Sequence, residues 1–544
     1  MELYENVYKC LERQDYDAAI VHIERLAAFD PKEAATLLVS LYIEQGDTLC
    51  AREAWEKLSV LQPTDFYTRF LYARILFMDG KIVSAYQELL KIKIPEDKKQ
   101  GYGEKIANLL GQCCRILGKS QEAAEAYHRA ASFAVGKELK ALEYSNYLFN
   151  LHYSGEHKAD FLREAAKGFA NLLNKKDIFN HPLRRRAKGP WRIGYLSSDI
   201  RRHVILCFCY DLLTAYDHKY FSVYIYMLGT EDGYSQKVKQ QVTGWRNLKG
   251  MPTKDAARVI YMDEIDILVD LAGHTKGNGL PIMAYKPAPV QLSGIGYFGS
   301  TGLPTVDYFL GDKYLDDERT QREFVEKLLV LPHSHFCYRP LISAIIEEPA
   351  FRRRGYVTFG SFNNFTKVNN KVLVLWRRLL EAVPNSHLLL KADVFDDGEV
   401  EEYTRKRLIE AGLPMERVDC RGISADYLSE YNDMDIALDT FPYPGGGTSC
   451  DALYMGRPLI TLAGETHGER FGRSLLMNLG LGELVAYTEI EYLEKAIMLA
   501  NDYELLQGLQ ENLRFIMQKS PLMNRQLYLQ NMENFYRMIM EERE

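Results

Sequence analysis

The sequence predicts an α plus α/β protein, in which an N-terminal α-solenoid precedes two doubly wound α/β domains. The first 150 residues contain paired amphipathic helical patterns that repeat at a regular interval. From residue 191 onward, short β-type apolar runs alternate with helical segments, and such alternation produces parallel sheets covered by helices. The chain has 544 residues. Roughly 350 of them lie in the region where strands and helices alternate, which is enough for two such domains.

The repeat period is marked by prolines that recur 32 residues apart, at Pro31, Pro63 and Pro95. Ahead of the first two, apolar residues share one helical face: Ala19, Ile23 and Leu26, then Ala51, Trp55 and Leu58. Gly46, Gly80 and Gly118 stand where the two helices of a pair would turn. The pattern resembles about four tetratricopeptide repeats with a degenerate third, and a plain helical bundle is the alternative. We expect a concave surface that recruits a protein or peptide.

Basic and helix-breaking residues separate the repeats from the α/β region. Residues from about 140 to 185 look helical, and the stretch NHPLRRRAKGP at 180–190 reads as a basic linker. We therefore predict the following boundaries: helical repeats over 1–150, a helical linker over 151–190, a first Rossmann-like lobe over 191–345, a second over 346–520, and a C-terminal helix over 521–544. Two such lobes bind ligands outside the carboxyl ends of their strands.

Composition and charge narrow the classes of function. A formal charge of −7 argues against a general nucleic-acid-binding protein. No apolar run reaches the length of a membrane span, and the acidic first residues lack the layout of a signal peptide. The nine cysteines are scattered without a metal-type CxxC pair. Reduced thiols fit a cytoplasmic protein best, and we expect neither membrane nor nucleic acid as a partner.

The most informative segment is DIALDTFPYPGGGTSCD, at 435–451. An apolar strand runs into a turn rich in proline and glycine, after which a helix begins. The glycines Gly445–Gly447 let the backbone approach a ligand closely, and the helix N-terminus favours an anion. Asp451, just inside that helix, could accept hydrogen bonds from ribose hydroxyls. The segment therefore indicates a seat for a nucleoside diphosphate. The alternative is a tight turn that needs glycine for positive φ.

Three further residues follow predicted strands and are therefore candidates for the same region. His203 and His274 each follow a strand of the first lobe, where a neutral imidazole could accept a proton or bond an acceptor hydroxyl. Lys367 follows the first strand of the second lobe and could neutralise a diphosphate leaving group. Taken singly, such residues are more often structural or solvated. The acidic pair Asp316-Asp317 reads as an exposed helix start, so we predict no metal site.

Six motifs occur in order along the chain: GYLSSD…H (194–203), DLAGHTKGN (270–278), KPAPVQ (286–291), GYFGSTGLPTVDY (296–308), FNNFTK (362–367) and LDTFPYPGGGTSCDALYMGRPLITLAGE (438–465). Together with the repeats, this arrangement resembles the glycosyltransferase family that contains O-GlcNAc transferase and the plant Spindly-type protein O-fucosyltransferases. The resemblance implies a GT-B fold of two Rossmann-like lobes. It also implies metal-independent, inverting transfer of a sugar from a nucleotide to serine or threonine of a protein.

The resemblance assigns roles to single residues. His203 matches the family histidine near the acceptor and the sugar, and His274 matches a histidine often proposed as the base. Lys367 matches the lysine on the diphosphate, Asp451 the acid that holds the ribose, and Tyr427 stands where a histidine often stacks on the nucleobase. The implied donor-binding residues are Asn364, Lys367, Tyr427, Gly445, Gly446, Gly447, Thr448, Ser449 and Asp451.

Departures from the family pattern leave the donor open. Gly446-Gly447 replaces the His-Thr pair of the mammalian turn, and Phe298 stands where many members have proline beside the sugar. We expect UDP-GlcNAc as donor and a protein acceptor that the repeats recruit. We expect no cofactor, and the sequence is compatible with a homodimer. UDP-glucose or GDP-fucose as donor, and asparagine as acceptor, are the alternatives. A repeat scaffold with vestigial catalytic lobes is the non-enzymatic alternative, and it predicts no nucleotide binding.

Overall fold

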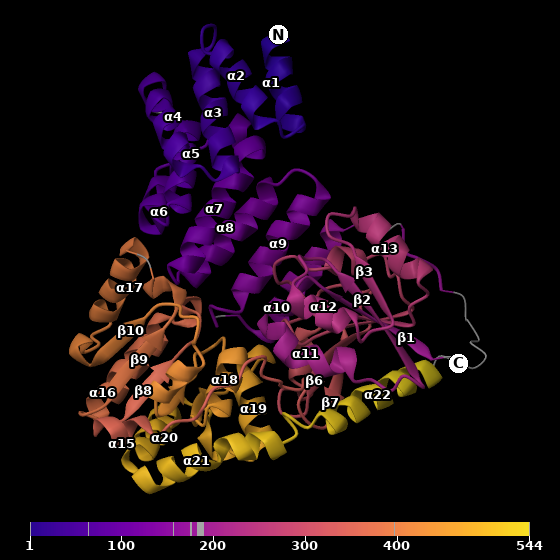
Figure 1. Cartoon of the computed structure of the whole chain (residues 1–544), viewed down its shortest axis with the longest axis vertical. Helices are drawn as coiled ribbons and strands as arrows, with labels where there is room; N and C mark the ends of the chain where they lie inside the picture. Colours follow the sequence, from indigo (N-terminus) through magenta and orange to yellow (C-terminus); the bar gives the residue numbers. More distant parts are fainter. Residues whose placement is uncertain are drawn as a thin grey trace. The chain divides into compact units, whose positions relative to one another are not determined.

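The computed structural model describes residues 2–63, 65–155, 157–173, 177–181, 190–396 and 398–542 (Figure 1). The chain divides into two compact units. The first unit comprises residues 1–135 together with 394–407, and the second comprises 136–393 together with 408–544. None of the described helices is long and apolar enough to cross a lipid bilayer.

The first unit consists mainly of consecutive helical hairpins, in which each helix packs against the next. The paired helices are α1 (Glu2–Glu12) with α2 (Tyr16–Leu26), α3 (Pro31–Gln45) with α4 (Thr48–Leu61), α5 (Phe66–Met78) with α6 (Ile82–Leu90), and α7 (Glu104–Ile116) with α8 (Ser120–Phe133). The predicted turn glycines Gly46, Gly80 and Gly118 lie between the helices of three pairs, with φ of 78°, 75° and 71°. Only glycine adopts this left-handed conformation without strain, so the repeat prediction is confirmed at these turns.

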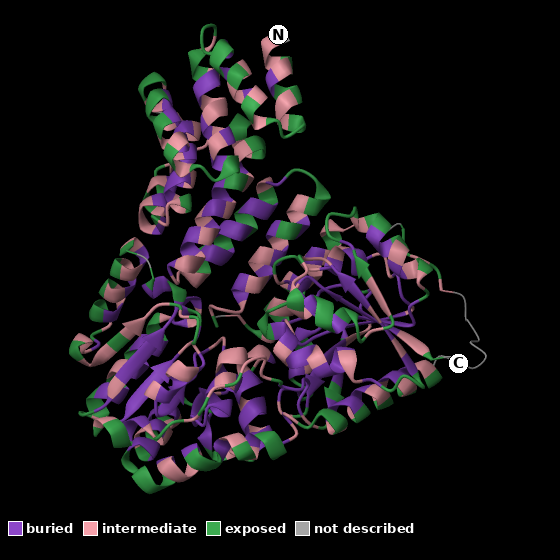
Figure 2. Ribbon diagram, viewed as in Figure 1, coloured by how far each residue is buried: buried purple, intermediate pink, exposed green. Residues whose placement is uncertain are grey.

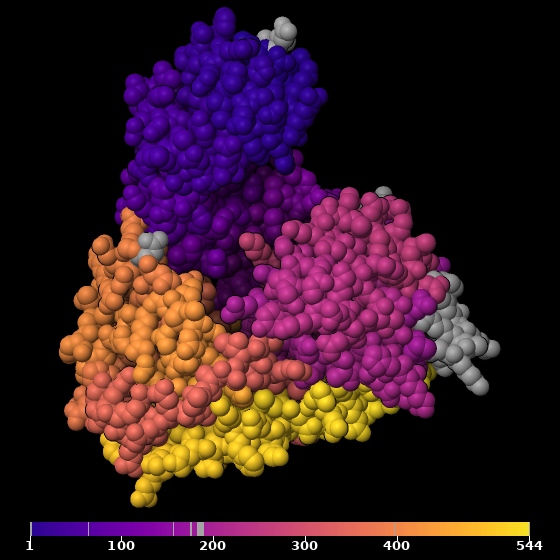
Figure 3. Space-filling view, viewed as in Figure 1, coloured from indigo at the N-terminus to yellow at the C-terminus, as the bar shows by residue number. Residues whose placement is uncertain are grey.

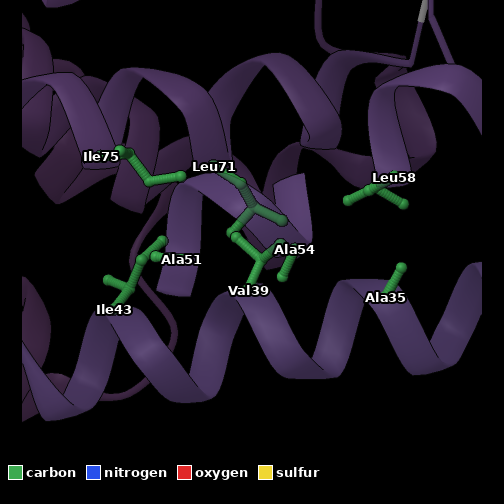
Figure 4. Close-up of a cluster of buried hydrophobic side chains, with 8 residues drawn as sticks. All are labelled: Ala35, Val39, Ile43, Ala51, Ala54, Leu58, Leu71 and Ile75. Carbon is green, nitrogen blue, oxygen red and sulfur yellow. The ribbon is translucent and has the colours of Figure 1, made fainter. Parts of the chain in front are cut away.

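Small and branched side chains form one buried cluster in the core of the array (Figure 4). The cluster contains Ala35, Val39 and Ile43 of α3, Ala51, Ala54 and Leu58 of α4, and Leu71 and Ile75 of α5. Trp55 packs against it, and its indole N–H donates to the carbonyl of Thr68 at 2.9 Å. The helical face predicted from Ala51, Trp55 and Leu58 is therefore the buried one.

A late segment of the chain also belongs to the first unit. Helix α17 (Gly398–Glu410) follows the second lobe's strand β9 (His387–Lys391), and its residues up to Arg407 cluster with the helical array. The backbone N–H of Ser84 in α6 donates to the carboxylate of Glu399 at 3.0 Å. The sequence pattern does not predict this partnership between residues more than 300 positions apart.

The first lobe of the second unit is a parallel sheet in the order β3-β2-β1-β4-β5-β6-β7. Its strands are β1 (Trp191–Ser197), β2 (Phe221–Met227), β3 (Gly244–Asn247), β4 (Ile267–Asp270), β5 (Val290–Ser293), β6 (Tyr308–Asp312) and β7 (Lys327–Leu331). The connecting helices are α11 (Val204–Thr214), α12 (Gly233–Lys239), α13 (Thr253–Met262) and the short α14 (Leu280–Met283). Strand β4 is buried at every position, as expected for a strand covered by helices on both faces.

The second lobe is a parallel sheet in the order β10-β9-β8-β11-β12-β13. Besides β9, its strands are β8 (Thr358–Ser361), β10 (Val418–Arg421), β11 (Ile436–Leu438), β12 (Leu459–Leu462) and β13 (Val485–Ala486). Its helices are α15 (Ala350–Arg354), α16 (Asn370–Ala382), α18 (Gly447–Tyr454), α19 (Phe471–Leu479), α20 (Glu489–Asn501) and α21 (Tyr503–Lys519). Figure 2 shows both sheets as mostly buried layers. The prediction of two doubly wound lobes is confirmed.

Two helices precede the first sheet within the second unit, namely α9 (Lys137–Leu151) and α10 (Ala159–Leu172). The predicted helical linker over 151–190 is therefore helical mainly in α10, and residues 177–181 are not helical. His181 instead forms a hydrogen bond with the carbonyl of Lys286 at 2.7 Å, which holds this stretch beside the first lobe. Residues 182–189, most of the predicted basic linker, lie outside the described residues.

The chain's last helix, α22 (Arg525–Glu541), returns to the first lobe (Figure 3). The hydroxyl of Tyr536 lies 3.1 Å from that of Tyr195 in β1, and Tyr528 donates to the carbonyl of His335 at 3.1 Å. The predicted C-terminal helix is thus present, and it packs against a strand that lies more than 300 residues earlier.

Two ionic contacts, one buried and one partly exposed, join the two lobes. Asp316 of the first lobe is 7% exposed and accepts from His467 Nδ1 of the second at 2.8 Å, while Asp317 pairs with Arg470 at 3.1 Å. The interpretation of Asp316-Asp317 as an exposed helix start is therefore wrong for Asp316. A carboxylate that loses its water needs such a partner, and sequence alone does not reveal a partner 151 residues away.

Candidate nucleotide-binding site

Two loops of the second lobe meet because the strands before them are neighbours. Strands β8 and β11 pair in parallel, with Phe359 opposite Ile436 and Gly360 opposite Ala437. The loop after β8 carries Lys367, and the loop after β11 carries the triple-glycine turn. Since parallel strands end at the same edge of a sheet, both loops lie at the carboxyl edge, where doubly wound folds bind ligands.

A buried aspartate holds the triple-glycine turn in shape. Asp439, the first residue after β11, is fully buried and accepts from the N–H of Gly445 at 2.6 Å and of Thr440 at 3.0 Å. Its other oxygen accepts from the hydroxyl of Thr461 at 2.8 Å. Burial raises the pKa of Asp439 to about 6, although these hydrogen bonds and Lys367 oppose the rise. Sequence reasoning missed Asp439, although its position directly after a predicted strand could have indicated a role at the sheet edge.

The glycines of the turn provide space rather than a left-handed backbone conformation. None of Gly445, Gly446 and Gly447 is among the described residues with positive φ. A Cβ at Gly445 would lie 2.2 Å from Ser449 Oγ, and one at Gly447 would lie 2.4 Å from Val204 Cγ2. The alternative that the turn needs glycine for positive φ is therefore wrong, since close packing is what excludes a side chain at these two positions.

Lys367 lies directly against this turn. Its ammonium donates to the carbonyl of Pro444 at 2.9 Å and lies 3.4 Å from Asn363 Oδ1. It also lies 4.9 Å from the centre of the Tyr443 ring. Desolvation lowers the pKa of Lys367 to about 8, with Asp439 opposing the shift. The structure thus places the Lys367 ammonium beside Pro444, immediately before the first glycine of the turn.

The asparagine that faces this cation is Asn363, the neighbour of the predicted donor-binding residue Asn364. Asn364 is exposed, and its side chain accepts from the N–H of Thr366 at 2.9 Å, which starts a short helical turn. Asn363 is 5% exposed, and its Oδ1 accepts from the hydroxyl of Thr448 at 2.9 Å. Asn363 therefore connects Lys367 to the first turn of α18. The sequence showed two adjacent asparagines and no feature that distinguished them.

The N-terminus of α18 opens at the triple-glycine turn. The first hydrogen bond of this helix runs from Cys450 N to Gly446 O at 3.1 Å. The N–H groups of Gly447, Thr448 and Ser449 come before it and so have no acceptor within the helix. These amides, with the positive end of the helix dipole, form an environment that suits an anionic group.

Two tyrosine hydroxyls hold the carboxylate of Asp451, one turn into α18. Tyr338, in the segment that follows the first lobe, donates to Asp451 Oδ1 at 2.5 Å, and Tyr427 donates to Oδ2 at 3.3 Å. Burial raises the pKa of Asp451 to about 6, and the two hydroxyls oppose the rise. The predicted pair of Tyr427 and Asp451 is therefore in contact. Tyr338 was missed, because it lies 113 residues away in sequence.

His203 reaches the same edge from the first lobe. It caps α11, where its Nδ1 accepts from the N–H of Ile205 at 3.3 Å. The next residue, Val204, packs so closely on Gly447 that a side chain there would have no room. The N-terminal turns of α11 and α18 therefore meet, which brings His203 beside the triple-glycine turn. Desolvation lowers the pKa of His203 although its residue stays exposed, so the imidazole is neutral at physiological pH.

His274 lies in a different environment. It is 2% exposed, with Nε2 3.1 Å from the carbonyl of Thr301 and Nδ1 2.9 Å from the hydroxyl of Ser145 in α9. Because a carbonyl can only accept, Nε2 carries the proton and Nδ1 accepts from Ser145. Burial lowers the pKa of His274 to about 3. Both ring nitrogens are used by these bonds, and the structure does not bring His274 against the triple-glycine turn.

The described residues contain no group of three or more histidine, cysteine, aspartate or glutamate side chains arranged to hold a metal ion. The charged groups described above for this site are Lys367, Asp439 and Asp451, and the helix N-terminus adds its partial positive charge.

The sequence model of glycosyl transferase family 41 matches residues 163–340 and 353–532, which is more than half of the chain. The chain belongs to glycosyl transferase family 41. Relatives of this family 41 chain include the barley (Hordeum vulgare) protein named probable UDP-N-acetylglucosamine–peptide N-acetylglucosaminyltransferase SPINDLY. The two are 38% identical over 406 residues, which cover 72% of this chain and 43% of the relative. SPINDLY of Arabidopsis thaliana is 40% identical over 358 residues, 64% of this chain and 39% of the relative. The matched region therefore spans less than half the length of these relatives.

A solved structure of Thermobaculum terrenum O-GlcNAc transferase, a lysine-to-methionine mutant, is similar to the family 41 chain throughout. The TM-score is 0.77 at 25% identity, with 100% of this chain and 97% of that chain covered. The match extends over the N-terminal helices as well as both lobes. The expected resemblance and the GT-B arrangement behind helical repeats are confirmed.

Proposed function

We propose that the chain is an inverting, metal-independent protein O-glycosyltransferase that transfers GlcNAc from UDP-GlcNAc to serine or threonine of a protein. The observation that carries the proposal is the ammonium of Lys367, 2.9 Å from the carbonyl of Pro444, at the open N-terminus of α18. This arrangement suits a pyrophosphate. The relatives named as UDP-GlcNAc–peptide transferases support the choice of donor and acceptor.

In the proposed reaction, the acceptor hydroxyl attacks the anomeric carbon as the bond to the nucleoside diphosphate breaks. The electron pair of the breaking bond leaves with the diphosphate. Lys367 and the amides of Gly447–Ser449 stabilise this growing negative charge, which is how preorganised donors lower a barrier. The carboxylate of Asp451 accepts hydrogen bonds from the ribose hydroxyls, because each of its oxygens has a further lone pair beside the one that Tyr338 or Tyr427 uses. The ring of Tyr427 stacks on the nucleobase. The helical repeats recruit the acceptor protein.

The hydrogen bonds of the two histidines favour positioning roles over proton abstraction. The N–H of Ile205 donates to Nδ1 of His203, so the proton of the neutral ring is on Nε2, which then donates toward substrate oxygens. Both ring nitrogens of His274 form hydrogen bonds, one with Ser145 and one with Thr301, so this side chain holds its part of the first lobe in place. In this arrangement the acceptor's proton passes to an oxygen of the donor or to water.

The rate should depend on pH through two groups of the free enzyme. Lys367, with a pKa of about 8, loses its charge as the pH rises through that value, so kcat/KM should fall above pH 8. Asp451, with a pKa of about 6, becomes protonated as the pH falls through that value, so kcat/KM should also fall below pH 6. Steady-state kinetics across both limbs would test this, and a flat alkaline side would remove Lys367 from the leaving-group role.

Thermal unfolding with a panel of nucleotide sugars would test the donor. A ligand at about 100 times its Kd adds about 2.7 kcal/mol to the free energy of unfolding, so UDP-GlcNAc should raise the Tm by several degrees. A larger rise with UDP-glucose or GDP-fucose would change the assigned sugar, and no rise with any nucleotide would favour the scaffold. Intact-mass analysis of acceptor peptides with serine or asparagine then identifies the sugar and the acceptor atom.

A further inference from the structure

Tyr153 and Gly155, which follow α9, lie directly against the loop after β11 that carries the triple-glycine turn. The rings of Tyr153 and Tyr443 are parallel, with an interplanar angle of 5° and centroids 4.5 Å apart. Two residues on, Gly155 has φ of 65°, and a Cβ there would lie 2.7 Å from Pro442 Cγ. A segment that precedes the first lobe therefore packs against Pro442-Tyr443 of the second, some 290 residues later in the chain.

Tyr443 connects this packing to the cation of the site. Its ring lies 4.9 Å from the ammonium of Lys367, and the carbonyl that accepts from that ammonium belongs to the next residue, Pro444. Phe149 in α9 also makes an edge-to-face contact with the Tyr443 ring, with centroids 6.3 Å apart. The orientation of Tyr443 thus influences two of the groups that contact the Lys367 ammonium, its own ring and the Pro444 carbonyl.

We propose that Tyr153 is a positioning residue of the sugar-transfer reaction, which sets the place of Lys367 by stacking on Tyr443. The inference rests on the proposed function. It extends the donor site to Tyr153, which precedes position 163, where the match to the family begins. Since Lys367 acts on charge that develops as the diphosphate leaves, a displaced ammonium weakens the transition state more than the bound donor.

Steady-state kinetics of Tyr153→Ala test the role. We expect kcat to fall by about tenfold, because a displacement of about 1 Å costs up to about 10²-fold, while the KM for the nucleotide sugar changes by less than about twofold. Water that enters in place of the ring should also move the alkaline limb of kcat/KM to higher pH, because a better solvated Lys367 regains its ordinary pKa. Tyr153→Phe keeps the stack and should restore both quantities.

The matched control is Tyr147→Ala. Tyr147 lies in α9, the helix that leads into Tyr153, and its ring packs on Tyr144, with centroids 5.3 Å apart. This variant removes the same side chain and should leave kcat and the alkaline limb unchanged. If Tyr153→Ala does not fold, Tyr153→Leu replaces it, because leucine keeps apolar volume without a flat ring. Calorimetry establishes that each variant is folded.

The outcomes separate this inference from the proposed function. Wild-type kcat and an unmoved alkaline limb in folded Tyr153→Ala or Tyr153→Leu would overturn the positioning role, with the transferase assignment intact. An equal loss in Tyr147→Ala would also overturn it, because the effect would then come from general packing. A wild-type protein that binds no nucleotide sugar would overturn the proposed function itself, and the inference with it.

Discussion

Replacing Lys367 with alanine should lower the rate of sugar transfer by about 10²- to 10³-fold, the typical loss when one preorganised donor to a developing charge is removed. The ammonium contacts the triple-glycine loop through Pro444 O at 2.9 Å. The fold should survive, because Lys367 keeps part of its surface exposed and donates to only one strong acceptor. Initial rates with UDP-GlcNAc and a protein acceptor provide the measurement.

The matched control for this variant is Lys371→Ala. Lys371 is an exposed lysine four residues later, in the first turn of α16. It lies on the same loop-to-helix segment, so the pair separates a general loss of positive charge from the loss of this particular ammonium. Full activity in Lys367→Ala, or an equal loss in Lys371→Ala, would contradict the leaving-group role.

Replacing Gly445 with alanine should weaken donor binding by about 10- to 100-fold, the equivalent of an overpacking cost of about 1–3 kcal/mol. The new methyl group would lie 2.2 Å from Ser449 Oγ and 2.9 Å from Asn363 Oδ1. The loop must shift to relieve this contact, and the shift disturbs the bond from Gly445 N to Asp439. Isothermal titration with the nucleotide measures the loss.

Gly446→Ala is the matched control within the same turn. The atoms nearest to a Cβ at Gly446 would belong to Phe471 and Phe208, at the ordinary contact distances of 3.7 and 3.8 Å. We therefore expect donor affinity within about threefold of wild type and an unchanged Tm. Equal losses in both variants would mean that the turn depends on its glycines for flexibility, and the packing explanation would fail.

The fold was predictable because its signals are local. The apolar run from Trp191 to Leu196 is strand β1 (Trp191–Ser197), and the run from Pro458 to Leu462 is β12 (Leu459–Leu462). A strand or helix face depends on the spacing of residues within a few positions, which the sequence displays directly. The errors arose where residues distant in the sequence determine whether a side chain is buried. Asp316 is an example, because it is buried against His467 of the other lobe.

The candidate site was predictable in part for the same reason. Lys367 and the turn from Gly445 to Ser449 lie in loops that follow apolar strands, and Asp451 lies in the first turns of the helix after that loop. Their placement at a sheet edge therefore followed from the pattern. Asp439 and Asn363, which shape that edge, were missed. Their importance depends on which side chains and amides they contact, and the pairing of β8 with β11 that creates those contacts cannot be read from either loop.

The amino-acid sequence by itself determined the helical repeats, the two doubly wound lobes and the family, because periodicity and ordered motifs are properties of short segments. Only the tertiary structure decided that Tyr338 holds Asp451, that Tyr153 stacks on Tyr443, and that α22 returns to the first lobe. These contacts join residues 113 to 341 positions apart. These contacts depend on how the folded helices and strands pack together. The local sequence pattern of each element is compatible with many different packing partners.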